Sequence, residues 1–298
     1  MEHQSQRKAQ MDQFGTVGMI LFAILLAFNQ VVVRVTNEGI QPVFFAGIRS
    51  VGAAFLLLLW MRFRGIPLDF ARAPLSGLWV ALLFAGQFMF LFLALDYTTV
   101  ARASVLFYTM PIWLTLAAHF LIPDERITSK KGIGLALAFG GVLCALAWPH
   151  DGRASGAGGV LGDIYAIAGA MCWAAIAVSA RITPLRTLRI EMQLFWQLLV
   201  SGPILIAAAL FFGPFLRDPE LIHWAGLGFQ IVVIAFAAFL VWFWFISIYP
   251  ASSIASFSFL SPIFGVAMGW LFLGEAVGLE LLLALALVCA GLILINRR

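Results

Sequence analysis

Ten apolar runs, each about 20 residues long, follow one another along almost the whole chain. Of its 298 residues, 63% are hydrophobic and only 11% are charged, which is too little charge for the surface of a soluble protein of this size. A hydrocarbon core about 30 Å thick needs about 20 apolar residues per helix. We therefore expect an all-α integral membrane protein with ten transmembrane helices, at residues 16–36, 42–61, 75–95, 99–121, 131–149, 160–180, 190–212, 222–248, 251–273 and 277–295.

The positions of the basic residues predict how these spans are oriented. With the N-terminus inside, thirteen of the 18 lysine and arginine residues fall in inside segments, and four fall in outside segments or at span ends. The remaining one, Arg49, lies within a span. Because basic residues gather on the cytoplasmic side of membrane proteins, both termini are expected to be cytoplasmic.

Composition argues against several other classes of protein. The net charge of +4 is spread among loops, which does not suggest nucleic-acid binding. The three cysteines lie in apolar runs, and the four histidines are scattered, so we expect no disulfide, metal site or cofactor. No nucleophile has a partner histidine or carboxylate at matching depth, so we expect no catalytic residue and no intramembrane enzyme.

Two stretches of the sequence, 98–146 and 251–294, resemble each other. Each carries a proline, an acidic residue 14 or 13 positions later and a glycine 16 positions further on, as Pro111–Glu125–Gly141 and Pro262–Glu275–Gly291. Apolar helices are similar by composition alone, but this ordered register favours a true repeat. Since each repeat would hold five spans, an odd number, the second would enter the membrane upside down. Such inverted repeats are typical of secondary transporters, with the substrate site between the halves.

Pro111, Pro262 and Gly86 are candidate gating or hinge residues. A proline inside a helix removes a backbone hydrogen bond and kinks the chain, and such kinks tend to face protein or a cavity. We expect both prolines to line a translocation path, although prolines are also common in membrane helices. Gly86 could act as a hinge, but a glycine that only lets two helices pack closely is the simpler interpretation.

With these ten spans, the two Pro–Glu–Gly registers and Arg49 in the second span, the chain resembles the drug/metabolite transporter superfamily, in particular its members with two EamA-type domains. Within that superfamily it is most similar to the bacterial aromatic amino acid exporters. The resemblance implies a bacterial inner-membrane protein with a central cavity walled by the third, fourth, sixth, eighth and ninth spans. It divides the chain into a cytoplasmic tail at 1–15, a first repeat at 16–149, an external linker at 150–159 and a second repeat at 160–298 that ends in a short cytoplasmic tail.

Polar and aromatic residues deep in the spans are the candidate substrate-binding residues. A polar side chain in lipid needs a partner, so Gln87 and Gln230 could bind a substrate's amino or carboxyl group, or could instead bridge two helices. Aromatic faces could stack on an aromatic ligand or hold a protonated amine, but aromatic residues are so frequent here that ordinary packing would also explain them. The candidates are Gln87, Tyr108, Trp113, Trp173, Gln230, Phe257 and Ser258.

Arg49 is the one charge placed well inside a span. It could pair with helix-end carbonyls or Asp96, reach the outer interface, or attract a carboxylate, and we take a structural role as the expectation. The acidic residues all fall near predicted span ends, whereas proton-driven carriers usually bury a titrating carboxylate or histidine. We therefore expect transport down the substrate's own gradient.

The expected function is export of small organic solutes, foremost aromatic and other neutral amino acids, by alternating access. The main alternative is an efflux carrier for lipophilic cations or drugs, and a channel or a scaffold is less favoured. The expected partners are a small-molecule substrate and membrane lipid, without nucleic acid, and we expect a monomer.

Overall fold

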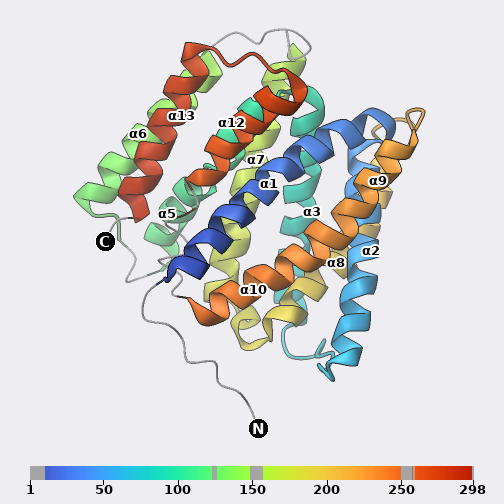
Figure 1. Cartoon of the computed structure of the whole chain (residues 1–298). Coiled ribbons are helices and arrows are strands. Elements are labelled where there is room, and N and C mark those ends of the chain that lie inside the picture. The colour runs from blue at the N-terminus through green and yellow to red at the C-terminus, as the bar shows by residue number, and fades with distance from the viewer. Residues whose placement is uncertain (1–10, 123–125, 148–156, 250–256, 258, 297–298) are drawn as a thin grey trace.

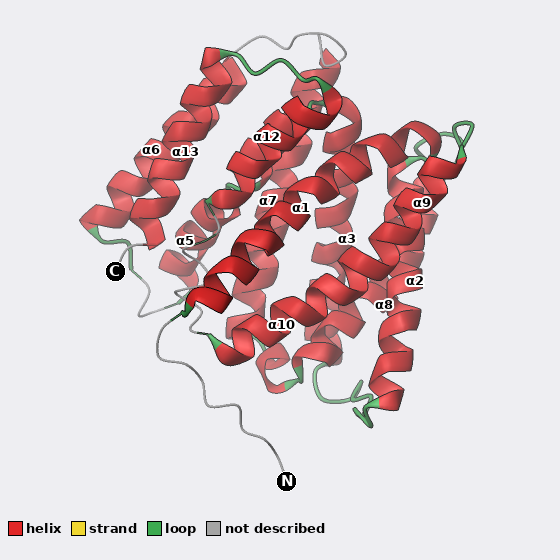
Figure 2. Ribbon diagram, in the orientation of Figure 1, coloured by secondary structure: helices red, strands yellow, loops and turns green. Residues whose placement is uncertain are grey.

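The computed structural model describes residues 11–122, 126–147, 157–249, 257 and 259–296 (Figure 1). This part of the chain is almost entirely helical and contains no β-strand, only an isolated bridge between Ile40 and Leu216 (Figure 2). The helices are α1 (Gln13–Gly39), α2 (Pro42–Phe63), α3 (Pro74–Tyr97), α4 (Val100–Phe107), α5 (Met110–Leu121), α6 (Ser129–Ala147), α7 (Ala157–Ile182), η2 (Pro184–Thr187), α8 (Ile190–Ala209), α9 (Leu221–Phe229), η3 (Gln230–Ala238), α10 (Phe239–Ile248), α12 (Leu260–Leu273) and α13 (Leu279–Asn296).

The helices confirm the predicted all-α membrane architecture. Within the described residues, nine helical stretches are long and apolar enough to cross a membrane, and α12 is a shorter apolar helix. The predicted ninth span, 251–273, begins in residues outside the described part of the chain. Caps set several of the boundaries: the Asp12 carboxylate accepts a hydrogen bond from the Gly15 N–H at the start of α1, and Gln41 does the same for Phe44 at the start of α2.

The predicted fourth span is interrupted rather than kinked. Helix α4 ends at Phe107 and α5 begins at Met110, which leaves Tyr108 and Thr109 between them. Pro111 lies in the first turn of α5, where its missing N–H would have had no partner within the helix. Pro262 is the third residue of α12 and also lies in a first turn. Both prolines therefore begin a helix, whereas the sequence had suggested that they bend a continuous one.

The eighth span contains a stretch of π-helix. Helix α9 continues without a break into η3, a nine-residue π-helix that starts at Gln230, and then into α10. Stretches of π-helix are rare and frequently lie at functional sites.

The packing of the helices follows a pseudo-two-fold pattern. The second, fourth and fifth spans each pack on the matching span of the other repeat: α2 packs on α8, α4 of the fourth span packs on α12 of the ninth, and α6 packs on α13. The first helix of each repeat packs on the third and fourth spans of the other repeat. Helix α1 packs on α9, η3 and α12, and its counterpart α7 packs on α3, α4 and α5. Counterpart helices run in opposite directions (Figure 1). The fold therefore consists of two inverted five-helix repeats.

Both termini lie at one end of the bundle. Helix α1 begins and α13 ends at the end that also carries the connection between α2 and α3 (Figure 1). We call this the terminal end. The connections from α1 to α2, from α3 to α4 and from α8 to α9 lie at the opposite end.

Glycines bring α6 and α13 into close contact. A Cβ atom on Gly141 would lie 2.8 Å from the carbonyl oxygen of Ala284, and one on Gly291 would lie 2.5 Å from the carbonyl oxygen of Gly134. Small residues at such positions let membrane helices approach until their backbones touch. The two glycines of the Pro–Glu–Gly registers thus hold the fifth and tenth spans together.

Candidate functional site

A buried polar cluster lies at the break between α4 and α5. The Ser104 hydroxyl donates a hydrogen bond to Gln30 Oε1 at 2.8 Å, and the Tyr108 hydroxyl is hydrogen-bonded to the side chains of Gln30 and Ser261. The exposed fractions of these four residues range from 0% for Ser104 to 7% for Tyr108. Because α1 and α4 belong to the first repeat and α12 to the second, the cluster spans the boundary between the repeats. We refer to Gln30, Ser104, Tyr108 and Ser261 as the polar cluster.

Aromatic rings adjoin the polar cluster. The Trp173 ring on α7 stacks on Phe107 with a centroid distance of 5.3 Å, and it meets Tyr108 edge to face at 6.2 Å. Gln87 on α3 is 6% exposed. Its backbone carbonyl oxygen would lie 3.3 Å from a Cβ atom on Gly169, which is one helical turn from Trp173 on α7. The structure therefore brings three predicted site residues, Gln87, Tyr108 and Trp173, to one region between α3, α4 and α7.

Gly86 lies against α7 in the same region. A Cβ atom at this position would approach Cys172 Sγ to 3.3 Å. That geometry supports close helix packing as the reason for glycine here.

The other predicted site residues lie elsewhere. Trp113 donates its Nε1–H to Thr109 Oγ1 at 3.2 Å and packs edge to face on Phe139 of α6. Gln230 donates to Asn29 Oδ1 on α1. Phe257 packs near the start of α1 and the end of α10, in a cluster with Met19, Phe245 and Tyr249. Ser258 lies outside the described residues.

Sequence reasoning missed Gln30, Asn29, Ser104 and Ser261. The signal for the first two was present, because both are amides inside an apolar run, and such groups need partners in lipid. Ser104 precedes Tyr108 by four residues, which places both on one helical face. Ser261 gave no comparable signal, since a hydroxyl can bond to its own helix backbone.

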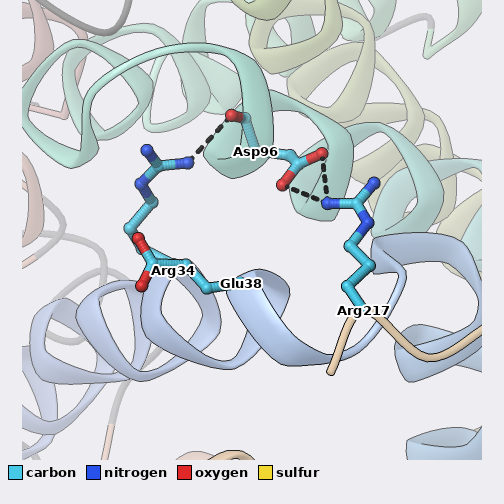
Figure 3. A pocket seen from close by; sticks show the side chains of 4 residues that line it. All are labelled: Arg34, Glu38, Asp96 and Arg217. Atoms are coloured by element: carbon cyan, nitrogen blue, oxygen red, sulfur yellow. Dashed lines mark hydrogen bonds and ion pairs between the residues drawn. The ribbon is translucent and has the colours of Figure 1, made fainter. Parts of the chain in front are cut away.

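Charged residues line a cavity of about 390 Å³ at the end of the bundle opposite the terminal end. Arg34 and Arg217 approach Asp96 from two sides, and Glu38 lies beside Arg34 (Figure 3). Arg217 Nη1 donates to both carboxylate oxygens of Asp96 at 2.9 and 3.0 Å and to the Asn37 carbonyl at 3.2 Å. Arg34 Nη1 donates to the Asp96 carbonyl oxygen at 2.8 Å. These contacts join α1 and α3 to the connection between α8 and α9.

A buried ion pair joins the repeats near the same end. Arg102 on α4 donates from Nη2 to Asp163 Oδ2 on α7 at 2.6 Å, and from the same atom to the Ala145 carbonyl at 2.6 Å. The Thr98 hydroxyl also donates to Asp163 at 3.1 Å. The Arg102 and Asp163 side chains are 10% and 0% exposed. A pair this deep is stable only because each partner has further hydrogen bonds.

Glu275 of the second repeat caps a helix of the first. Its carboxylate oxygens accept the Val100 and Ala101 N–H groups at 2.7 and 2.8 Å, at the first turn of α4. Burial raises the pKa of the Glu275 carboxyl, and these two donors and Arg34 counteract part of that effect. The acidic residue of the second Pro–Glu–Gly register thus accepts two N–H groups at the start of α4 that have no partner within the helix. Its counterpart Glu125 lies outside the described residues.

The structural partners expected for Arg49 are not the ones observed. Asp96 pairs with Arg217, and Arg49 is 0% exposed, so it does not reach an interface. Within the described part of the chain its nitrogens have no hydrogen-bond partner, so no helix-end carbonyl accepts from it either. None of the expected pairings is therefore present among the described residues, and the Arg49 guanidinium lies instead over the Phe88 ring, 3.9 Å from its centroid.

Comparison with known proteins agrees with this architecture. The model of the EamA-like transporter family matches residues 13–147 and 160–297. The chain is 24% identical to the uncharacterized transporter YoaV of Bacillus subtilis, over 93% of this chain and 94% of the relative. It is 26% identical to a probable amino-acid metabolite efflux pump of Escherichia coli, over 92% and 91% of the two chains.

A solved structure described only as a protein crystal structure has the same fold. Its TM-score is 0.66 at 19% identity, over 93% of this chain and 95% of that one. The two family matches each cover one five-helix repeat and together account for most of the chain. The protein is therefore a multi-pass membrane transporter, not an enzyme, and belongs to the EamA-like family of the drug/metabolite transporter superfamily.

Proposed function

We propose that this transporter exports aromatic and other neutral amino acids by alternating access. The observation that carries the proposal is the polar cluster, with the Phe107–Trp173 stack beside it, at the interruption of the fourth span. Interrupted spans between inverted repeats are where secondary carriers bind their solutes. Amide and hydroxyl groups suit the polar end of an amino acid, and the rings suit an aromatic side chain. Relatives named as probable amino-acid metabolite efflux pumps support the same substrate class.

The inverted repeats supply the mechanism. Two similar halves can exchange conformations, which gives inward-open and outward-open states of comparable energy. We propose that residues 16–149 and 160–298 act as these halves, in a monomer whose termini face the cytoplasm of a bacterial cell. Under this orientation the charged cavity of Figure 3 lies on the outer side, and the Arg217–Asp96 pair must separate when that side opens.

Exchange by purified protein in liposomes tests the substrate class. Liposomes loaded with unlabelled L-phenylalanine should take up labelled L-phenylalanine by counterflow, and a labelled lipophilic cation should not be exchanged. Trp173→Ala should weaken the apparent affinity roughly two- to twelvefold, because it removes one aromatic stacking partner. Trp173→Phe should keep most of the affinity.

Trp270→Ala is the matched control, since this tryptophan on α12 is 62% exposed on the lipid-facing surface. It should transport like the wild type. Exchange of lipophilic cations in preference to every amino acid would favour the alternative function. Unchanged affinity in Trp173→Ala would place the binding site elsewhere.

We further propose that transport follows the substrate gradient without a proton. Among the described residues, Asp163 is paired with Arg102, the Glu275 carboxylate accepts two backbone N–H groups at the start of α4, and His119 Nδ1 accepts the Ile127 N–H at 3.1 Å, so each of these groups already has a structural partner. Uptake of L-phenylalanine into liposomes should therefore be the same with and without an imposed pH gradient. Proton-driven accumulation above the external concentration would contradict this proposal.

A further inference from the structure

Arg49 on α2 is a buried cation without a counter-charge. The residue is 0% exposed, and its Nε, Nη1 and Nη2 atoms are each buried with no hydrogen-bond partner in the described structure. Two other arginines on the helices, Arg102 and Arg34, have acceptors. Arg102 has a carboxylate and a carbonyl, and Arg34 has two carbonyls. A guanidinium carries five N–H donors. An arginine with a purely structural role would be expected to donate them to carbonyl or carboxylate oxygens, as Arg102 and Arg34 do.

Aromatic rings surround this guanidinium without satisfying it. Its Cζ atom lies 3.9 Å from the centroid of the Phe88 ring and 5.8 Å from that of Phe92, both on α3. Phe45 and Phe84 extend the same aromatic wall through contacts with Phe92 and Phe88. Ring faces attract a cation but do not accept the hydrogen bonds that lie in the guanidinium plane. The N–H groups at the edge of the guanidinium therefore remain available, and their fork geometry suits bidentate recognition of a carboxylate.

The surroundings of Arg49 lead to Gln87 on α3 and to Gln230 on η3, two amides that the sequence had marked as candidate substrate-binding residues. Phe88, on which it stacks, follows Gln87 directly on α3. Gly52, about one helical turn from Arg49 on α2, lets Ile231 of η3 approach closely, since a Cβ there would lie 2.8 Å from the Ile231 side chain. Gln230, which precedes Ile231, has a buried Oε1 atom without a partner among the described residues. The unsatisfied donors of Arg49 on α2 and the unsatisfied acceptor of Gln230 on η3 thus lie on helices that pack together. A zwitterion needs both kinds of group.

We infer that Arg49 recognises the carboxylate of the transported solute, and this inference rests on the proposed export of amino acids. The substrate class narrows to solutes that carry a carboxylate, with the amino group directed toward the Gln230 Oε1 atom on η3. A buried guanidinium repels lipophilic cations, so the same residue selects against the alternative class of substrate. Arg49 is closed off in this conformation, so carboxylate binding is coupled to a rearrangement of α2 against α3 and η3.

The test compares three probes that differ in charge at one end: L-phenylalanine, L-phenylalaninamide, which lacks the carboxylate charge, and phenethylamine, which lacks the carbonyl carbon altogether. Exchange in liposomes is measured for the wild type, Arg49→Gln and Arg49→Lys. The wild type should prefer the acid over both analogues. Arg49→Gln should lose that preference, with a fall of about tenfold to a hundredfold for the acid and little change for the analogues, as expected for one charge-assisted bidentate contact.

Arg49→Lys should keep part of the preference, because it retains the charge and loses the planar fork. Arg64→Gln is the matched control, since Arg64 follows the end of the same helix, is exposed and has only a distant contact with Trp60. It should transport like the wild type. Melting temperatures of all variants in detergent report folding, and L-phenylalanine should raise the melting temperature of the wild type but not that of Arg49→Gln.

The outcomes separate the two claims. If the wild type exchanges no amino acid, the proposed function fails and this inference fails with it. If the wild type exchanges L-phenylalanine and the folded Arg49→Gln and Arg49→Lys variants keep its full preference for the acid, the role of Arg49 is refuted while the proposed function stands. If Arg49→Gln does not fold, full preference in Arg49→Lys with an unchanged L-phenylalanine affinity refutes the role, and a partial loss supports it.

Discussion

Asp163→Ala should lower the free energy of unfolding by about 3–5 kcal/mol, the cost of leaving a buried charge without its partner. In this variant Arg102 would retain only the Ala145 carbonyl as an acceptor, and Thr98 would lose the acceptor of its hydroxyl. The loss is large because the Asp163 side chain is 0% exposed, so the remaining charge on Arg102 stays buried. Arg102→Met should cost a similar amount for the same reason.

The double variant Arg102→Met with Asp163→Leu tests whether the two buried charges are energetically coupled. Replacing both ions by apolar groups of similar size removes the desolvation cost together with the attraction, so it should be close to neutral or stabilising. The surface pair between Arg72 and Asp69 offers a matched control, with side chains 60% and 32% exposed. Asp69→Ala should cost at most about 1 kcal/mol.

Reversible unfolding in mixed micelles measures these changes, with the variants compared at one pH and one salt concentration. A loss below 1 kcal/mol in Asp163→Ala would show that the pair contributes little. A double variant as unstable as the single ones would show that the two charges are not coupled.

Two adjacent glycines on α6 should respond to alanine with opposite signs. A Cβ on Gly141 would lie 2.8 Å from the Ala284 carbonyl oxygen of α13, whereas nothing lies within 4 Å of a Cβ on Gly140. Gly141→Ala should therefore destabilise the protein by about 1–3 kcal/mol, the usual cost of overpacking. Gly140→Ala should stabilise it by up to about 1 kcal/mol, because alanine loses less backbone entropy in a helix.

Thermal unfolding of the two variants side by side makes this comparison, since both carry the same chemical change one residue apart. Gly291→Ala should follow Gly141→Ala, because its Cβ would lie 2.5 Å from the Gly134 carbonyl oxygen on the facing helix. Equal effects at 140 and 141 would mean that α6 and α13 are not held together by close backbone contact.

The spans could be predicted from the sequence because lipid imposes a simple rule. Every span must be long, apolar and internally hydrogen-bonded, and nine described stretches satisfy that rule close to the expected residues. The inverted repeat was also accessible, because the Pro–Glu–Gly register survives in both halves. The same register identified Gly141 and Gly291, which the structure places in the contact between α6 and α13.

The candidate site was predicted only in part. Tyr108 and Trp173 are in contact at the boundary of the repeats and Gln87 lies on the adjoining helix α3, but Trp113 faces α6 and Gln230 bonds to Asn29. The face of a helix that lines the interior depends on how the two repeats pack. A span that is apolar on every face has no hydrophobic periodicity, so its sequence does not identify that face. Residues held by partners more than 60 positions away, such as Gln30 and Asp163, cannot be paired from local sequence. The π-helix that starts at Gln230 likewise left no sequence signal that we recognised.

The Glu275 cap has a consequence for how the protein is made. The N–H groups of Val100 and Ala101 are synthesised 175 and 174 residues before the Glu275 carboxylate that will accept them. At about 5–20 residues per second of synthesis, the first turn of α4 waits on the order of ten seconds or more with a donor exposed. The first turn of α4 can therefore be capped only after the connection between α12 and α13, which carries Glu275, has been synthesised.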